Sequence, residues 1–97
     1  MNLSDNQRMK LDELEIKVAK YFNIRVQDII NFTNNHNISL ARSYVFYIAH
    51  HDMKISASCI AKEYYRKVRG VFKSISKIKY LIENQRRYRN IYNDIVQ

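Results

Sequence analysis

Cationic side chains are concentrated in one stretch of the sequence, "RKVRGVFKSISKIKYL" (66–81). Six of its sixteen residues are Lys or Arg, and seven are apolar, counting Tyr80. Guanidinium and ammonium groups bind phosphate oxygens, and Arg also grips the O6 and N7 atoms of guanine. The stretch therefore predicts either a surface that lies along a polyanion or the solvated face of a small bundle.

The net charge of +8 is confined to the C-terminal half of the chain. Residues 1–53 hold six Lys and Arg against six Asp and Glu, whereas residues 54–97 hold eleven against three. A one-sided field of this kind suits phosphate backbones or anionic lipid. We therefore expect a polyanion as partner.

The composition favours an all-α protein. The 97 residues include no Pro and one Gly, and 46% of them are hydrophobic. Strand-rich folds need turn residues at short intervals, so we expect one helical domain over residues 1–97. The single Cys fits a reducing compartment, and neither a membrane span nor a signal peptide is evident. These features predict a cytoplasmic protein without a membrane partner.

Capping residues and apolar spacing predict three helices in the first half of the chain. Ser4 opens a capping box, and apolar residues then recur at helical spacing to about residue 22. The segment 23–32 is typical of a short second helix, and the Asn-rich residues 33–37 of a loop. A third helix, with the broad apolar face of a central helix, is expected over 39–52.

The second half of the chain predicts a helix-turn-helix. Ser56 is a good N-cap for a helix over 57–65, a sharp turn is expected at 65–67, and a fifth helix at about 68–82. Apolar residues between 88 and 95 mark a last helix or a bent continuation. The expected fold is a small orthogonal bundle of five to six helices, with the motif at about 56–64 and 68–82.

The fifth helix divides into an apolar and a cationic side. The inward side is expected to hold Val68, Val71, Phe72, Ile75, Ile78 and Ile82. The side chains left mostly outside are Arg66, Lys67, Arg69, Lys73, Lys77 and Lys79. The earliest of them lie at the helix N-terminus, the end that such a motif presents to base edges. Cations are unfavourable there, and a bound phosphate or guanine edge would offset that cost.

The order of these segments resembles the C-terminal DNA-binding domain of the bacterial replication initiator DnaA, over roughly residues 11–95. The resemblance rests on four segments: "VAKYFNIRVQDII" (18–30), "LARSYVFYIAHH" (40–51), "ISASCIAKEYY" (55–65) and "VFKSISKIKYLIE" (71–83). It implies a Trp-repressor/DnaA-like helix-turn-helix that reads duplex DNA.

The signature of that family is degenerate in this chain. The family has Gly-Gly-Arg-Asp-His-Thr-Thr-Val where this sequence has "YRKVRGV" (65–71), which is one residue shorter. Arg66 and Val71 match, and Arg69 and Gly70 replace the two threonines. Most residues that read the initiator's nine-base-pair box are thus replaced, and the replacements raise the positive charge.

The resemblance also assigns roles to residues outside the signature. Arg42 falls where the family has an arginine that enters the minor groove, although a helix-surface arginine is an equal alternative. Lys54 and Ser56 lie in the loop that meets phosphates in the family, and Ser56 can cap its helix as well. The DNA-binding residues expected in all are Arg42, Lys54, Ser56, Arg66, Lys67, Arg69, Lys73 and Lys77.

Other chemistry finds no support in the sequence. The single glycine excludes a P-loop, and the three His residues do not approach zinc spacing with Cys59. We therefore expect no nucleotide, cofactor, metal or enzymatic activity. The expected protein is a monomer that binds double-stranded DNA in replication control or transcription regulation. The alternative is an interaction module whose basic face binds an acidic partner of the replication machinery.

Overall fold

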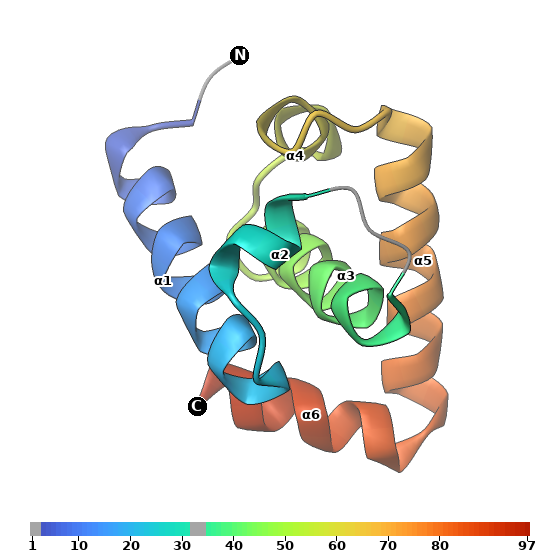
Figure 1. Ribbon diagram of the computed structural model, residues 1–97. Coiled ribbons are helices and arrows are strands. Elements are labelled where there is room, and N and C mark those ends of the chain that lie inside the picture. Colours follow the sequence, from blue (N-terminus) through green and yellow to red (C-terminus); the bar gives the residue numbers. More distant parts are fainter. Residues whose placement is uncertain (1–2, 32–34) are drawn as a thin grey trace.

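The computed structural model describes residues 3–31 and 35–97 (Figure 1). The six helices within these ranges are α1 (Asp5–Phe22), α2 (Val26–Ile30), α3 (His36–His51), α4 (Ala57–Glu63), α5 (Val68–Asn84) and α6 (Arg86–Val96). Neither range contains a strand. The expected small all-α bundle with a helix-turn-helix, formed by α4 and α5, is confirmed.

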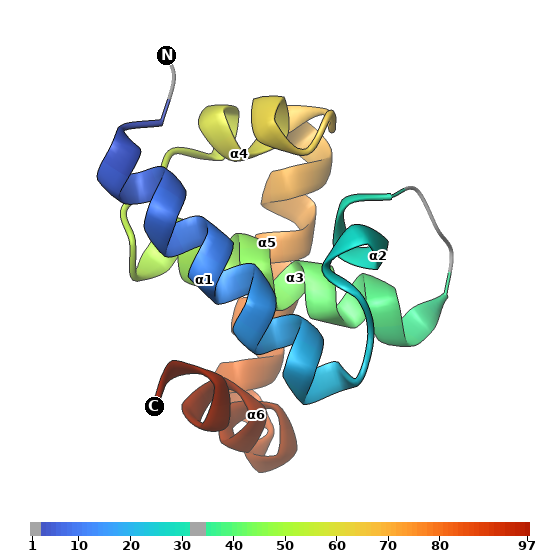
Figure 2. The ribbon, with the colours of Figure 1, turned by 60° about the vertical axis from the view of Figure 1, so that its left-hand side comes forward.

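The helix α3 occupies the centre of the molecule, as its broad apolar face predicts. All six residues from Tyr44 to Ala49 are buried, which requires neighbours around the whole circumference of the helix. Those neighbours are α1, α2, α4 and α5 (Figures 1 and 2). The helix α3 therefore fixes where α5 lies, and α1 lies on the far side of α3 from α5.

The predicted start of α1 is confirmed, whereas α3 starts earlier than predicted. The capping box of α1 is confirmed, because Ser4 Oγ accepts from the amide of Gln7 at 3.1 Å. The helix α3 begins at His36, three residues before the expected start, because the Asn35 side chain accepts from the Ile38 amide at 3.2 Å. The loop expected over 33–37 is thus wrong at 36–37, and residues 33–34 lie outside the described residues.

The helix α2 is shorter than the segment 23–32 that was expected to form it. Asn23 ends α1 in the left-handed conformation, with φ 56°, so the chain turns before α2 can start. Arg25 is the N-cap of α2, and its amide donates to the Asp28 carboxylate at 3.0 Å. Asn31 is the C-cap and has an extended backbone; residue 32 lies outside the described ranges.

The helix α6 is separate from α5 rather than a bent continuation. Gln85 between them is extended, with φ −132° and ψ 121°. Arg89 secures the corner, because its guanidinium donates to the carbonyls of Ile82 and Glu83 at 3.2 and 3.0 Å. In Figure 1, α6 runs across the end of α5 and brings the C-terminus beside α1.

Candidate nucleic-acid interface

The turn between α4 and α5 is built without a glycine. The helix α4 ends at Glu63, two residues earlier than expected, because Tyr65 is left-handed with φ 55°. The amide of Arg66 donates to the Ala61 carbonyl at 2.8 Å, as in a Schellman motif. The sharp turn predicted at 65–67 is therefore present, and α5 starts at Val68.

The helix-turn-helix is anchored to α1 by two polar contacts next to this turn. The Tyr64 hydroxyl donates to the buried carboxylate of Glu15, and Arg8 pairs with Glu63 at 2.5 Å. Burial raises the pKa of Glu15, while its hydrogen bond from Tyr64 opposes that rise. The turn is therefore fixed by buried as well as exposed contacts.

The buried face of α5 orients its cationic side chains outward. Four residues of α5 are buried: Val71, Ile75, Ile78 and Ile82. At 3.6 residues per turn, Arg69 and Lys73 lie on the opposite side of the helix, and both are exposed. Lys77 is exposed at the border of this side. None of the three makes an ion pair or hydrogen bond within residues 3–31 and 35–97.

Two residues expected on the buried face of α5 are instead on its surface. Phe72 is 50% exposed and Val68 is 39% exposed. Val68 lies in the first turn of α5, and Phe72 lies at the flank, where its ring forms a T-shaped pair with the ring of His50. Phe72 therefore joins the outer surface of α5, and so does Tyr80, which is 63% exposed.

The N-terminus of α5 carries no acidic compensation. Its N-cap, Lys67, makes no side-chain capping hydrogen bond, and no acidic residue lies in the first turn. The first amides of a helix lack partners within the helix and carry a partial positive charge. Together with Arg69, they make this helix end a favourable place for an anion.

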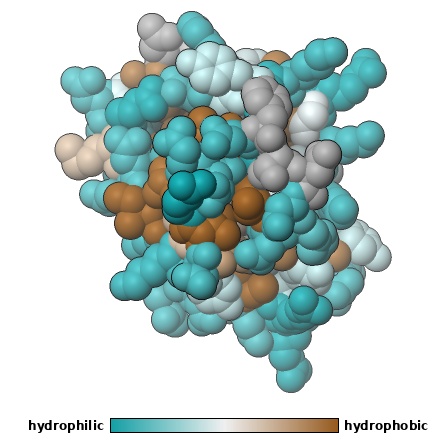
Figure 3. Space-filling view, viewed as in Figure 1, coloured by the Kyte–Doolittle hydropathy of each residue, from teal (hydrophilic) through white to brown (hydrophobic). Residues whose placement is uncertain are grey.

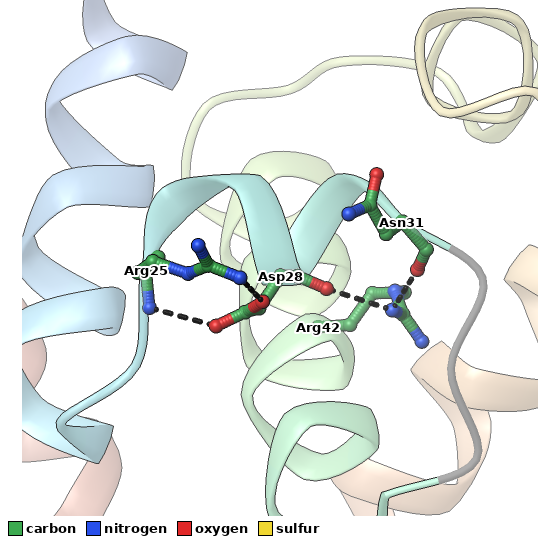
Figure 4. A network of polar contacts seen from close by, with 4 residues as sticks. All are labelled: Arg25, Asp28, Asn31 and Arg42. Carbon is green, nitrogen blue, oxygen red and sulfur yellow. Dashed lines mark hydrogen bonds and ion pairs between the residues drawn. The ribbon is translucent and has the colours of Figure 1, made fainter.

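Arg42, predicted to enter a minor groove, points inward in the structure. Only 7% of its surface is exposed, and its guanidinium binds carbonyls at the C-terminal end of α2 (Figure 4). Its Nε donates to Ile29 at 2.7 Å, and its Nη2 donates to Asn31 at 2.5 Å and to Asp28 at 3.2 Å. These contacts replace the helical bonds that the last carbonyls of α2 lack. Arg42 therefore holds α2 on α3.

Arg66 lies against the same carbonyl group as Arg42. Its Nη2 donates to the oxygen of Asn31 at 3.2 Å, and its Nη1 donates to Tyr64 at 3.3 Å. Burial lowers the pKa of Arg42 and of Arg66, and the neighbouring charge of Arg66 contributes to the lowering at Arg42. Two guanidinium groups are thus held together beside the start of α5.

A cavity of 230 Å³ opens beside these arginines, between α3 and α5. Its lining combines three cationic residues, three serines, Phe46 and the only glycine: Ser39, Arg42, Ser43, Phe46, Arg66, Lys67, Gly70 and Ser74. The three serines were not among the site residues predicted from the sequence. The sequence shows only that residues 39 and 43, and residues 70 and 74, are four apart and so share one side of a helix. The packing of α3 on α5 brings these two pairs together.

A second hollow, of 560 Å³, lies on the other flank of α5 and includes Lys54 and Ser56. Ser56 caps α4, because its Oγ accepts from the Cys59 amide at 3.1 Å. Lys54 has φ 59° and is exposed. Lys79, which was not selected as a site residue, lines the same hollow. The predicted cations therefore lie at the outer face and on both flanks of α5, and Arg42 alone is inward.

The surface supports this assignment of the outer face. In Figure 3, hydrophilic side chains project at the edge where Figure 1 places α5, and apolar ones gather nearer the centre, around α2. Among the described residues, no three His, Cys, Asp or Glu side chains lie together as metal ligands would. No helix in these ranges has both the length and the apolar character that crossing a membrane requires.

No protein-family model matches this chain, and no curated protein matches it significantly. The assignment of the surface therefore depends on its geometry and charge.

We expect Gly70→Ala to stabilise the protein. Gly70 is helical, and a Cβ there would meet no heavy atom within 4 Å, so the gain in helix propensity of about 1 kcal/mol is not opposed by a clash. Thermal unfolding would measure the change. A lower melting temperature would contradict it, and a loss of DNA affinity with higher stability would show that the backbone at Gly70 closely approaches the duplex.

Proposed function

We propose that this chain is a double-stranded DNA-binding module that inserts α5 into the major groove. The observation that carries the proposal is the outer side of α5, where Arg69, Lys73 and Lys77 are exposed without ion pairs among the described residues. In helix-turn-helix proteins, the second helix lies in the groove and its N-terminal residues contact base edges. The open, cationic N-terminus of α5 suits that placement.

The flanks of α5 support contacts with the two phosphate backbones. Lys54 and Lys79 line one flank, and Arg66 and Lys67 line the other. Phosphate contacts fix the register of a protein on the duplex, and base contacts supply specificity. A recognition helix with cations on both sides is therefore suited to a groove whose walls are both anionic.

We further propose that the module is of the DnaA C-terminal type and acts as a cytoplasmic monomer in replication control or transcription regulation. The resemblance over residues 11–95 and the helix-turn-helix formed by α4 and α5 support this proposal. The degenerate signature at 65–71 indicates that its bases are read by different side chains. The proposed function requires neither a nucleotide nor an enzymatic step.

Salt dependence tests the proposal. Each neutralised phosphate contributes about −0.9 to the slope of log K against log salt, so roughly five contacts predict a slope of about −4 to −5. The five expected contacts come from Lys54, Arg66, Lys67, Lys73 and Lys77. Fluorescence anisotropy on labelled duplexes between low and moderate salt would measure the slope.

The substitution Lys77→Ala is expected to make that slope shallower by about 1 and to weaken all duplexes equally. Lys10→Ala is the matched control, because Lys10 is an exposed lysine of α1, on the far side of α3 from α5. A slope near zero in the wild-type protein would remove phosphate contact as the basis of binding. Tight binding to an acidic protein in place of DNA would favour the interaction module.

A further inference from the structure

The 230 Å³ cavity between α3 and α5 has the composition of an anion site. The side chains of Arg66, Lys67 and Ser74 line it from the side of the motif, and those of Ser39, Arg42 and Ser43 from α3. None of its described lining residues is acidic. Arg42, Arg66 and Ser43 donate to main-chain carbonyls, which carry no net charge. The cavity therefore combines positive charge and serine hydroxyls with no carboxylate among its described lining residues.

Two positive charges lie side by side at the cavity. The Nη2 atoms of Arg42 and Arg66 both lie within 3.2 Å of the Asn31 carbonyl oxygen, so two positive charges are held close together. The carboxylate nearest in sequence to Asn31, Asp28, points away toward Arg25, which it binds at 3.2 Å (Figure 4). The carbonyls of Asp28, Ile29, Asn31 and Tyr64 accept from these two groups but carry no net charge, so an anion in the adjacent cavity would further reduce the repulsion.

The shape of the cavity also fits an anion. Its volume is several times the roughly 30 Å³ that one water molecule occupies in the liquid. Gly70 contributes no side chain to its wall, and a Cβ there would meet open space. The first turn of α5, where the helix dipole favours negative charge, begins at the same wall.

We propose that this cavity binds one phosphate group, either inorganic phosphate or a phosphodiester of bound DNA. The second source rests on the proposed function, because the cavity adjoins the end of α5 that enters the groove. Ser74 offers it a hydroxyl from the wall formed by α5, and Arg66 and Lys67 balance its charge. Ser43 lines the opposite wall, where its hydroxyl donates to the Ser39 carbonyl at 3.0 Å. Arg42 remains bound to α2 and contributes long-range attraction.

The first experiment measures inorganic phosphate binding by the shift of the Gly70 amide in ¹⁵N–¹H NMR spectra. Saturable shifts are expected in the wild-type protein and not in matched chloride. Ser43→Asp, which places a carboxylate in the cavity, is expected to weaken phosphate binding at least tenfold. Asn6→Asp adds the same charge on α1, beyond α3, and is expected to leave binding unchanged. If Ser43→Asp fails to fold, the same test uses Ser74→Asp, which also places a carboxylate in the cavity.

The second experiment replaces single phosphates of a bound duplex with neutral methylphosphonate. At one position of the duplex, the neutral group is expected to weaken DNA binding by the wild-type protein and by Asn6→Asp about tenfold. DNA binding by Ser43→Asp is expected to be unchanged by the same replacement. DNA binding without this coupling, and without phosphate shifts, would overturn the cavity proposal and leave the proposed function intact. Phosphate shifts without DNA binding would support the cavity as an anion site and overturn the proposed function. If DNA binding, the methylphosphonate effect and the phosphate shifts are all absent, both the cavity proposal and the proposed function are overturned.

Discussion

Arg42→Met is expected to lower the free energy of unfolding by about 3 kcal/mol. The carbonyls of Asp28 and Ile29 would lose this donor, and that of Asn31 would keep only its bond from Arg66. Hydrogen bonds to a charged group are worth about 1.5–3 kcal/mol, with a further cost when a buried partner stays unsatisfied. Methionine keeps most of the side-chain volume, so the loss reports the hydrogen bonds more than packing. Chemical denaturation of both proteins would measure the difference.

Arg86→Met is the matched control for this prediction. Arg86 is exposed in the first turn of α6, where a cation opposes the helix dipole, so its loss is expected to change stability by less than about 0.5 kcal/mol. Arg42→Lys is expected to recover little, because an ammonium group does not reproduce the planar donors of a guanidinium. Wild-type stability of Arg42→Met, combined with a loss of minor-groove preference, would restore the DNA-reading role that the resemblance implies.

Arg69→Ala is expected to reduce the preference for one base pair by about 1–3 kcal/mol, which is roughly 5- to 150-fold. Arg69 is exposed near the open end of α5, with no partner among the described residues, so its guanidinium is available to the O6 and N7 atoms of guanine. Non-specific affinity is expected to stay nearly intact. Selection of bound duplexes from a random pool, followed by single-base variants of the best site, would measure the preference.

Lys73→Ala is the comparison on the same side of α5. It removes one positive charge without a bidentate group, so it is expected to weaken all sequences alike. If Arg69→Ala also weakens all sequences alike, Arg69 binds phosphate rather than a base. If neither substitution changes DNA binding, the outer side of α5 is a solvated surface and the alternative of an acidic protein partner gains support.

Local sequence signals predicted most of the fold. The scarcity of Gly and Pro excluded a strand-rich fold, and the capping residues Ser4 and Ser56 marked helix starts. Apolar spacing selected six inward residues of α5, of which four are buried and two are exposed. The same spacing placed Arg69, Lys73 and Lys77 on the exposed side. These features follow from periodicity and hydrogen bonding within a few residues, which is why one sequence sufficed to predict them.

Tertiary packing decided the rest. Whether Arg42 points outward or inward depends on α2, whose terminal carbonyls offer it buried acceptors that no local pattern reveals. The exposure of Phe72 and the cavity beside Gly70 both depend on how α3 packs on α5. The sequence therefore determined the helices, the helix-turn-helix and its charge. The structure determined which cations remain free to bind, because an arginine satisfies whichever acceptors the packed chain brings within reach.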